Sequence, residues 1–160
     1  MRKRDFITGI IAITLSSKAL SAQESFKIMK SEQEWKKILT PAQFAILRKE
    51  RTEKPFSNSL MGESSNLLYE KRDGIYCCAG CKNELYLSST KYESGTGWPS
   101  FYEAISDSVS YRTDWKLFFP RTEVHCADCG GHLGHVFDDG PNPTGKRHCI
   151  NALSLLFKST

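Results

Sequence analysis

Cys78-Ala-Gly-Cys81 and Cys126-Ala-Asp-Cys129 are the stretches that decide the fold of this 160-residue chain. Each places two thiols on one tight turn, and two such C-x-x-C turns supply the four ligands of a tetrahedral zinc site. The turns are separated by 44 residues, so a shared metal would join distant parts of the chain rather than hold a finger. Four thiolates leave no open coordination position, and we therefore expect one structural Zn²⁺ per chain.

The six cysteines allow two other interpretations. One is a secreted domain held by three disulfides without metal. The other is a zinc module that only binds proteins, in which loss of Cys149 would not affect function. We favour zinc over disulfides, because a chain of this length buries a core without such crosslinks and paired C-x-x-C spacing is typical of metal ligands. Cys77 lacks this spacing to Cys81 and is expected to stay outside the metal site.

Residues 1–22 differ from the rest of the chain. A basic start precedes an apolar run from Phe6 to Leu15 and then a series of small residues. This order predicts a secretory signal peptide, since the apolar run is too short to span a bilayer, and a buried N-terminal helix is the alternative. We expect an exported protein, periplasmic or secreted, with a single domain over 23–160, a core over about 32–158, and no stable membrane span.

The charge of the chain argues against nucleic acid as a partner. Residues 1–22 carry a net charge of +3 and so account for most of the +4 of the whole chain. What remains after their removal is +1, which is too little for a basic surface that attracts nucleic acid. The composition, 39% hydrophobic and 25% charged, is that of a soluble globular domain.

Two short helices are expected near the start of the domain. Ser31-x-x-Glu34 is a capping-box pattern that predicts a helix over 32–39. Thr40, followed by Pro41 and then Gln43, predicts a second helix that ends near Glu50. The polar stretch after it, over 52–66, is expected to be a loop.

From Gly74 onward the pattern is that of short strands. Aromatic and β-branched runs alternate with clusters of Gly, Pro, Asn and Asp, which predicts a mainly β fold of two antiparallel sheets, sandwich-like or barrel-like. The predicted strands cover 75–78, 84–88, 101–105, 108–112, 117–119, 123–126, 135–138 and 148–157.

Cys149 lies outside the predicted metal site, in Lys146-Arg147-His148-Cys149-Ile150-Asn151. On a strand, residues two apart share a face, so Arg147, Cys149 and Asn151 would point the same way. The Arg147 guanidinium would favour the reactive thiolate, and the Asn151 amide offers hydrogen bonds to a polar substrate. An inert buried cysteine is the alternative, but this setting favours a redox or acyl-transfer enzyme.

Two further motifs carry reactive or recognition groups. His132 and His135 follow the second C-x-x-C turn, and because four cysteines complete the metal site, proton transfer is a better role for them than metal binding. Trp98 lies in Gly95-Thr96-Gly97-Trp98-Pro99-Ser100-Phe101. It is either a core residue at a strand start or an aromatic wall for an apolar ligand group.

Taken together, these motifs resemble the B-type methionine sulfoxide reductases, which reduce the R epimer of methionine sulfoxide. The resemblance extends from about Trp35 to Phe157. It rests on Thr40-Pro41-Ala42-Gln43-Phe44, Thr52-Glu53-Lys54-Pro55-Phe56, Gly95-x-Gly-Trp-Pro-Ser-Phe101, Arg121-Thr122-Glu123-Val124, His132-x-x-His135-Val136-Phe137 and Arg147-His148-Cys149-Ile150-Asn151. It implies a fold of two antiparallel sheets and a zinc ion bound by Cys78, Cys81, Cys126 and Cys129.

The resemblance also implies a role for each site residue. Cys149 would be the nucleophile, which becomes a sulfenic acid as methionine departs. His132 and His135 would polarise or protonate the sulfoxide oxygen, and Trp98 would pack against the ε-methyl group. The remaining site residues that the resemblance implies are Arg147 and Asn151 in the catalytic group, and Asp139 and Phe101 in the substrate-binding group.

One departure from the family's pattern concerns regeneration. Many members have a resolving cysteine where this chain has Thr96, which cannot form a disulfide with Cys149. Cys77 is the one cysteine left for that role, and it adjoins the predicted ligand Cys78. We therefore expect an external thiol reductant, a thioredoxin-like protein or a small thiol. The substrate would be methionine-R-sulfoxide, free or in oxidised proteins, in repair during oxidative stress.

Overall fold

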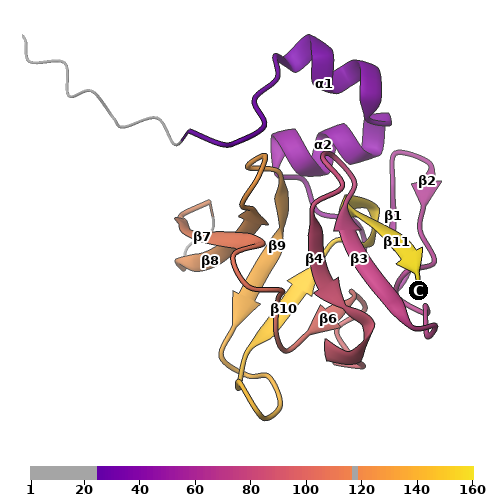
Figure 1. The fold of residues 1–160 in the computed structure, drawn as a ribbon, viewed down its shortest axis with the longest axis vertical. Coiled ribbons are helices and arrows are strands. Elements are labelled where there is room, and N and C mark those ends of the chain that lie inside the picture. The colour runs from indigo at the N-terminus through magenta and orange to yellow at the C-terminus, as the bar shows by residue number, and fades with distance from the viewer. Residues whose placement is uncertain (1–24, 117–118) are drawn as a thin grey trace, which may run out of the picture.

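The computed structural model describes residues 25–116 and 119–160. The signal peptide predicted over 1–22 lies outside these residues, as do two of the three positions of the strand predicted over 117–119. Within the described part, two short helices lie over one end of a mainly β structure (Figure 1). The predicted fold class is therefore confirmed. None of the described helices has the length and apolar character that a membrane span requires.

Both helices begin at the predicted caps. They are α1 (Glu32–Ile38) and α2 (Pro41–Lys49). The Ser31 hydroxyl accepts a hydrogen bond from the Glu34 N–H, and the Glu34 carboxylate accepts one from the Ser31 N–H. Thr40 and Gln43 form the same reciprocal pair at the start of α2. Each cap satisfies backbone donors that have no partner inside the helix, so it fixes where the helix begins.

The strands in the described part of the chain form three antiparallel sheets. The six-stranded sheet has the order β5 (Lys91–Tyr92), β6 (Ser100–Phe101), β10 (Arg147–Ile150), β9 (His132–Phe137), β8 (Arg121–Cys126) and β7 (Val109–Asp114). The three-stranded sheet has the order β11 (Leu155–Ser159), β3 (Gly74–Cys78) and β4 (Glu84–Leu87). A small hairpin joins β1 (Ser59–Leu60) to β2 (Glu63–Ser64), within the stretch predicted as loop.

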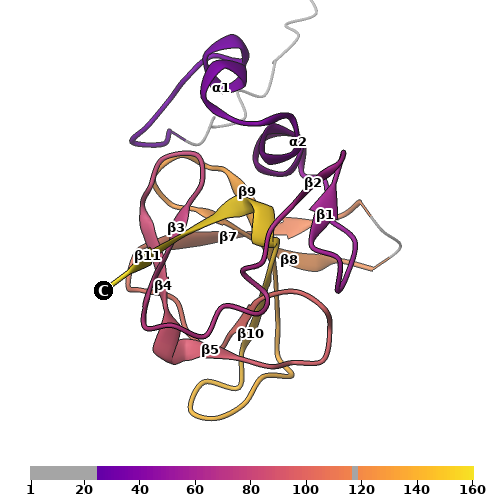
Figure 2. The same ribbon diagram turned by 90° about the vertical axis from the view of Figure 1, so that its right-hand side faces the viewer.

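The core lies between the two larger sheets, which curve around it, with α2 against one end (Figure 2). The rings of Tyr86 from β4 and Phe101 from β6 stack at 4.3 Å between centroids, and Tyr76 from β3 meets Phe101 edge-on. All three are fully shielded from solvent. Burial of one such ring contributes about 1.5–3 kcal/mol, so these rings hold the two sheets together.

The strand predicted over 148–157 is interrupted. It consists of β10 in the six-stranded sheet and β11 in the three-stranded sheet, with the short 3₁₀ helix η2 (Ala152–Ser154) between them. The Glu53 carboxylate accepts hydrogen bonds from the Ala152 and Leu153 N–H groups, so a distant loop fixes this break. The predicted strand over 101–105 is also shorter, and only its start belongs to β6.

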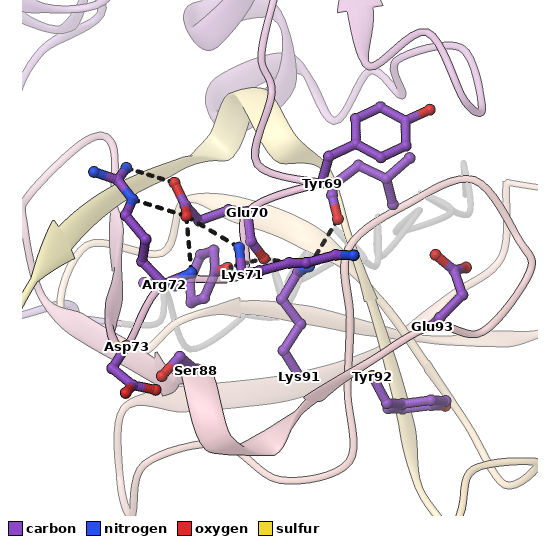
Figure 3. Close-up of a pocket in the computed structure, with 11 residues that line it drawn as sticks. Tyr69, Glu70, Lys71, Arg72, Asp73, Ser88, Lys91, Tyr92 and Glu93 are labelled. Atoms are coloured by element: carbon purple, nitrogen blue, oxygen red, sulfur yellow. Dashed lines mark hydrogen bonds and ion pairs between the residues drawn. The ribbon is translucent and has the colours of Figure 1, made fainter.

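A polar cavity of about 390 Å³ lies between segment 68–73 and the edge strand β5 (Figure 3). Inside it, the Lys91 ammonium donates to the carbonyl oxygens of Leu68, at 2.7 Å, and of Glu70, at 3.0 Å. The Glu70 carboxylate in turn accepts two bonds from the Arg72 guanidinium. Burial lowers the pKa of Lys91. The two bonds from Lys91 tie the segment to β5, which follows the short 3₁₀ helix η1 (Ser88–Thr90).

Candidate active site and metal centre

The register of the six-stranded sheet places one polar side chain from each strand in a single row. Residues directly opposite each other in antiparallel strands project to the same face. Following the pairs from strand to strand, the row consists of Tyr92, Ser100, Cys149, His135, Glu123 and Arg112. Cys149 on β10 therefore lies in the middle of the sheet, between Ser100 and His135.

The Cys149 thiol opens into a cavity of about 100 Å³. The residues around it come from five of the stretches that the sequence analysis quoted, one of which lies in the loop before the β1–β2 hairpin. The lining residues are Thr52, Trp98, Arg121, Gly134, His135, Phe137, Cys149 and Asn151. Distant segments thus bring a thiol, an imidazole and an indole to one small, mostly apolar pocket.

Two opposing effects act on the Cys149 thiol. Burial raises its pKa, and the Thr96 hydroxyl and the Arg147 guanidinium both lower it. Arg147 is held in place by Asp139, which accepts two hydrogen bonds of 2.8 Å, and by the Phe137 ring, 4.4 Å from the guanidinium. The effect expected of Arg147 is therefore present, but burial outweighs it and the net shift is upward.

His135 is the imidazole opposite Cys149 in the sheet. Its Nε2 lies 2.8 Å from a carboxylate oxygen of Asp114, which also accepts a bond of 2.7 Å from Arg121. Burial lowers the pKa of His135, and Asp114 acts against this shift. Burial would raise the pKa of Asp114, but bonds from the Lys116 N–H, His135 and Arg121 keep it at about 2. Asp114 is therefore an ionised acceptor at neutral pH.

His132 lies behind the pocket instead of lining it. Its side chain is only 3% exposed, and its ring centroid is 5.4 Å from that of His135. The register of β8 and β9 shifts after Val124, which leaves Leu133 without a partner on β8. This β-bulge turns the strand so that two histidines three residues apart come together. His132 Nδ1 is 2.7 Å from the Glu123 carboxylate, which also pairs with Arg112.

Glu53 organises the opposite wall of the pocket, and the prediction from sequence did not include it among the site residues. Its carbonyl oxygen accepts the indole N–H of Trp98 at 3.2 Å. Its backbone N–H donates to the Asn151 amide oxygen at 3.1 Å, while the Asn151 amide nitrogen donates to the Leu133 carbonyl. Asn151 is therefore fixed by backbone groups on both sides. The only signal for Glu53 was its place in the family-like stretch Thr52–Phe56.

The structure corrects the prediction for Phe101. Its side chain is completely buried, stacks on Tyr86 in the core, and does not line the Cys149 pocket. On β6 it pairs with His148, which belongs to the face opposite Cys149. Asp139 does not line the pocket either, and its contact is with Arg147.

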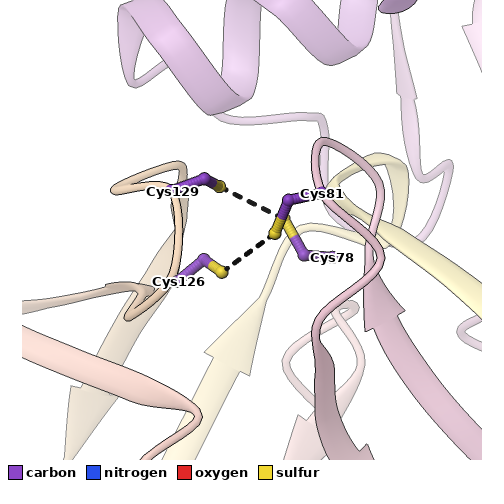
Figure 4. Close-up of side chains that lie close together, drawn as sticks. All are labelled: Cys78, Cys81, Cys126 and Cys129. Carbon is purple, nitrogen blue, oxygen red and sulfur yellow. Dashed lines mark hydrogen bonds between the residues drawn. The ribbon is translucent and has the colours of Figure 1, made fainter. Parts of the chain in front are cut away.

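The four cysteines of the two C-x-x-C turns come together as predicted (Figure 4). All four sulfur atoms lie within 4.8 Å of one another, with Cys78 3.8 Å from Cys129 and Cys81 3.5 Å from Cys126. A tetrahedral site with Zn–S bonds of about 2.3 Å has S–S edges of about 3.8 Å. The cluster therefore has the dimensions of a site for one metal ion.

Both turns of the metal site have the same local geometry. The Cys78 carbonyl accepts a bond from the Lys82 N–H, and the Cys126 carbonyl accepts one from the Gly130 N–H, each at 2.8 Å. Lys82 and Gly130 have left-handed backbone angles, with φ of 65° and 67°. The first turn joins β3 to β4 and the second joins β8 to β9, so the site bridges the two large sheets.

Cys77 is remote from this chemistry in the sheet topology. It lies on β3 in the three-stranded sheet, nearly buried, whereas Cys149 lies on β10 in the six-stranded sheet. Thr96 lies beside Cys149, with its hydroxyl 3.8 Å from the sulfur.

A comparison with protein families matches the SelR domain to residues 39–159. The chain belongs to the SelR family. Among curated relatives, the peptide methionine sulfoxide reductase MsrB of Methanosarcina barkeri is 56% identical over 133 residues, which is 82% of this chain and 89% of that protein. The chloroplastic peptide methionine sulfoxide reductase B1 of Oryza sativa is 52% identical over 131 residues, covering 81% of this chain and 58% of that protein. Among solved structures, the yippee-like domain of Mis18 aligns with 56% of this SelR chain and 98% of that chain, with a TM-score of 0.43 and 14% identity.

Proposed function

We propose that this chain is a peptide-methionine (R)-S-oxide reductase, which uses a thiol to reduce methionine-R-sulfoxide and so repairs oxidised proteins. Its membership of the SelR family and its relatives, named peptide methionine sulfoxide reductases, support this activity. The observation that carries it is the pocket itself, where the Cys149 thiol, the His135 imidazole and the Trp98 indole meet. A small apolar pocket with one thiol suits a sulfoxide flanked by short alkyl groups.

In the proposed reaction, the Cys149 thiolate attacks the sulfoxide sulfur, and a proton must reach the sulfoxide oxygen. The attack joins Cys149 Sγ to the substrate sulfur. The protonated oxygen then moves from the substrate sulfur to Cys149 Sγ, so the substrate S–O bond and the sulfur–sulfur bond both break, Cys149 becomes a sulfenic acid, and methionine leaves. The substrate sulfur gains the two electrons that the Cys149 sulfur loses. His135 is the proposed proton donor because it lines the pocket opposite Cys149, and His132 supports it from behind.

The other pocket residues orient the substrate. Trp98 offers an apolar face to the ε-methyl group, and Glu53 and Asn151 keep that indole and the pocket wall in place. Arg147 supports the thiolate from the same strand, with Asp139 holding its guanidinium.

Regeneration is proposed to use an external thiol. The Thr96 hydroxyl lies 3.8 Å from the Cys149 sulfur, and Cys77 lies in the other large sheet. One reductant thiol would displace the sulfenic hydroxyl as water and form a mixed disulfide, which a second thiol would then resolve. A Cys77–Cys149 disulfide found by peptide mapping after turnover would contradict this route.

Zn²⁺ is the metal proposed for the four-cysteine site. The sulfur–sulfur distances support it, and four thiolates without an oxygen ligand are typical of structural zinc. Export to the periplasm or the exterior is proposed from the composition of residues 1–22 alone.

The deciding experiment compares residues 23–160 of the wild type with Cys149→Ser, using R- and S-methionine sulfoxide with dithiothreitol as reductant. We expect turnover of the R epimer only, and its loss in the variant. Cys77→Ser is the matched control and should keep its activity. Absence of turnover on both epimers in a folded, metal-containing protein would contradict the proposal and favour a zinc module that only binds proteins.

A further inference from the structure

Three hydroxyl groups form a hydrogen-bonded chain from a backbone carbonyl to the reactive sulfur. The Ser100 hydroxyl donates to the Trp98 carbonyl at 3.1 Å. The Ser94 hydroxyl lies 2.7 Å from that of Ser100 and 2.8 Å from that of Thr96. The Thr96 hydroxyl lies 3.8 Å from Cys149 Sγ. Ser100 is fully buried and directly opposite Cys149 in the sheet, so the chain runs beside the pocket.

The Trp98 carbonyl at one end fixes which hydroxyl donates and which accepts in each hydrogen bond of this series. A hydroxyl has a single proton and donates one hydrogen bond, whereas a carbonyl only accepts. If Ser100 donates to the Trp98 carbonyl, Ser94 must donate to Ser100 and Thr96 must donate to Ser94. Thr96 then has no proton left for Cys149 and can only accept one. This direction fits the protonated thiol.

The thiolate requires the reverse direction, because a negative sulfur accepts hydrogen bonds and donates none. Thr96 must then donate to the sulfur, Ser94 to Thr96, and Ser100 to Ser94. The Trp98 carbonyl loses its bond from Ser100 in this state. We infer that the three hydroxyls reverse together when Cys149 ionises, with Thr96 as the residue that binds the thiolate. Each hydroxyl only rotates, no O–H bond breaks, and the thiol proton leaves to solvent.

This inference deepens the proposed function and rests on Cys149 being its nucleophile. It gives Thr96 a catalytic role at the position where many members of the family have a resolving cysteine. Ser94 and Ser100 become positioning residues that act through Thr96. They hold Thr96 in its accepting state and so oppose ionisation of Cys149, whereas the Thr96 hydroxyl itself favours ionisation. Removing Thr96 and removing its partners should therefore have opposite effects.

Charged and titratable groups also face Cys149 from the neighbouring strands. Arg147 on the same strand favours the thiolate, and Asp139 opposes it. His135 lies opposite on β9, and Tyr92 lies beyond Ser100 in the row. The hydroxyl variants described next retain all four side chains, so a change in ionisation is attributable to the hydroxyl chain.

The test measures the rate of Cys149 alkylation by iodoacetamide as a function of pH, followed by mass spectrometry of the peptide that contains Cys149. The assay contains no sulfoxide, so it tests the inference about Thr96 whether or not the protein reduces methionine sulfoxide. Thr96→Val keeps the shape and removes the hydroxyl, and we expect the apparent pKa to rise by about one unit, with about tenfold slower alkylation at neutral pH. Thr96→Ser should restore the wild-type value.

Ser94→Ala should shift the apparent pKa in the opposite direction, downward by about half a unit, since it leaves Thr96 free to donate to the thiolate. Ser100→Ala is a second variant with the same expected sign. A pKa that is unchanged in Thr96→Val would overturn the inference. Upward shifts in both Thr96→Val and the serine variants would also overturn it, because they would indicate general disturbance of the pocket.

Discussion

At the scale of single residues, Asp114 decides how His135 can deliver a proton. The Asp114 pKa of about 2 keeps its carboxylate ionised, so His135 Nε2 must be the donor in their 2.8 Å contact. The other nitrogen, Nδ1, carries a proton only when the ring is an imidazolium. In the proposed reaction, His135 would therefore donate the Nδ1 proton of its charged form, while the Nε2 proton remains on the ring in the hydrogen bond to Asp114.

Asp114→Asn should move the pH dependence of the reaction. Asp114 acts to raise the pKa of His135 against the effect of burial, so removing its charge should lower that pKa further. The fall in kcat/KM for methionine-R-sulfoxide at alkaline pH should then begin at lower pH than in the wild type. Asp107→Asn, which changes an exposed carboxylate, is the control and should leave the profile unchanged. An unchanged pH profile of kcat/KM in Asp114→Asn would show that His135 is not the group whose titration limits activity at alkaline pH.

Glu53 gives a prediction for stability. Burial raises the pKa of its carboxyl group, and the N–H groups of Ala152 and Leu153 oppose this shift only in part. Because the folded-state pKa lies above the ordinary value of 4.5, the folded state holds this proton more tightly than the unfolded chain. The contribution of Glu53 is therefore greatest at low pH and falls as the pH rises through the raised pKa.

Glu53→Gln should abolish this pH dependence. It should also lower the free energy of unfolding at neutral pH by about 1–3 kcal/mol, because an amide has one acceptor oxygen where the carboxylate has two. Urea unfolding at several pH values measures both effects. Glu103→Gln, at an exposed position, serves as the control. If the unfolding free energy of Glu53→Gln varied with pH in parallel with that of the wild type, Glu53 would not titrate over the pH range measured.

At the scale of elements, the close approach of β9 and β10 depends on Gly134. A Cβ atom at this position would collide with the Cys149 carbonyl oxygen and lie 3.0 Å from its carbonyl carbon. The obstacle is backbone rather than the end of a flexible side chain, so the strands cannot yield without moving Cys149. Gly134 therefore contributes to the pocket because its missing side chain lets the Cys149 backbone approach β9.

Gly134→Ala should separate these two strands and displace Cys149. We expect a loss of at least tenfold in kcat/KM together with a lower melting temperature, measured by turnover of the R epimer and by thermal unfolding. Gly80→Ala is the matched control, since a Cβ there meets its neighbours at ordinary contact distances of 3.5 Å or more. Equal effects of the two substitutions would show that the steric argument at Gly134 is incorrect.

The elements that the sequence predicted well are those with local causes. Ser31 and Thr40 form their caps with residues three positions away, so both helices begin where the pattern placed them. The break at η2 depends on Glu53, about a hundred residues earlier, and the bulge in β9 depends on its pairing with β8. These contacts join segments that are far apart in the sequence, so the spacing of neighbouring residues does not predict them.

The same distinction applies to the site. Alternation on one strand correctly brought Arg147 and Cys149 to one face, and C-x-x-C spacing correctly grouped the four metal ligands. Phe101 was misassigned because an aromatic residue in a Gly-rich motif does not reveal which face of its strand it occupies. Ser94 was not predicted as a site residue, because its two hydroxyl contacts with Thr96 and Ser100 form only when the chain folds.

At the scale of the whole molecule, a metal ion in the four-cysteine site would be a crosslink between the two large sheets. Zinc binding stabilises small zinc-dependent folds by about 10–16 kcal/mol, whereas a typical domain has a net stability of about 5–15 kcal/mol. Loss of the ion would therefore remove an amount comparable to the entire stability. The aromatic stack of Tyr86 and Phe101 would be left to hold the sheets together.

Removal of the metal should unfold the protein at or near room temperature. We expect Cys81→Ser to purify without its full complement of zinc, to lack the cooperative melting transition of the wild type and to lose activity, as measured by metal analysis and calorimetry. Cys77→Ser changes a neighbouring thiol outside the cluster and should retain zinc and melt like the wild type. A metal-free protein with an unchanged melting temperature would show that the sheets associate without the crosslink.

The row of polar side chains across the six-stranded sheet has a consequence for refolding. Each of the six strands contributes one member of this row, from Tyr92 on β5 to Arg112 on β7. A slip of one residue in any of these strands would turn its contribution to the opposite face. Enzymatic turnover therefore reports whether the strands of the refolded sheet have paired in the correct register. Molecules that regain their β-sheet spectrum without regaining activity would be those whose strands have paired one position out of step.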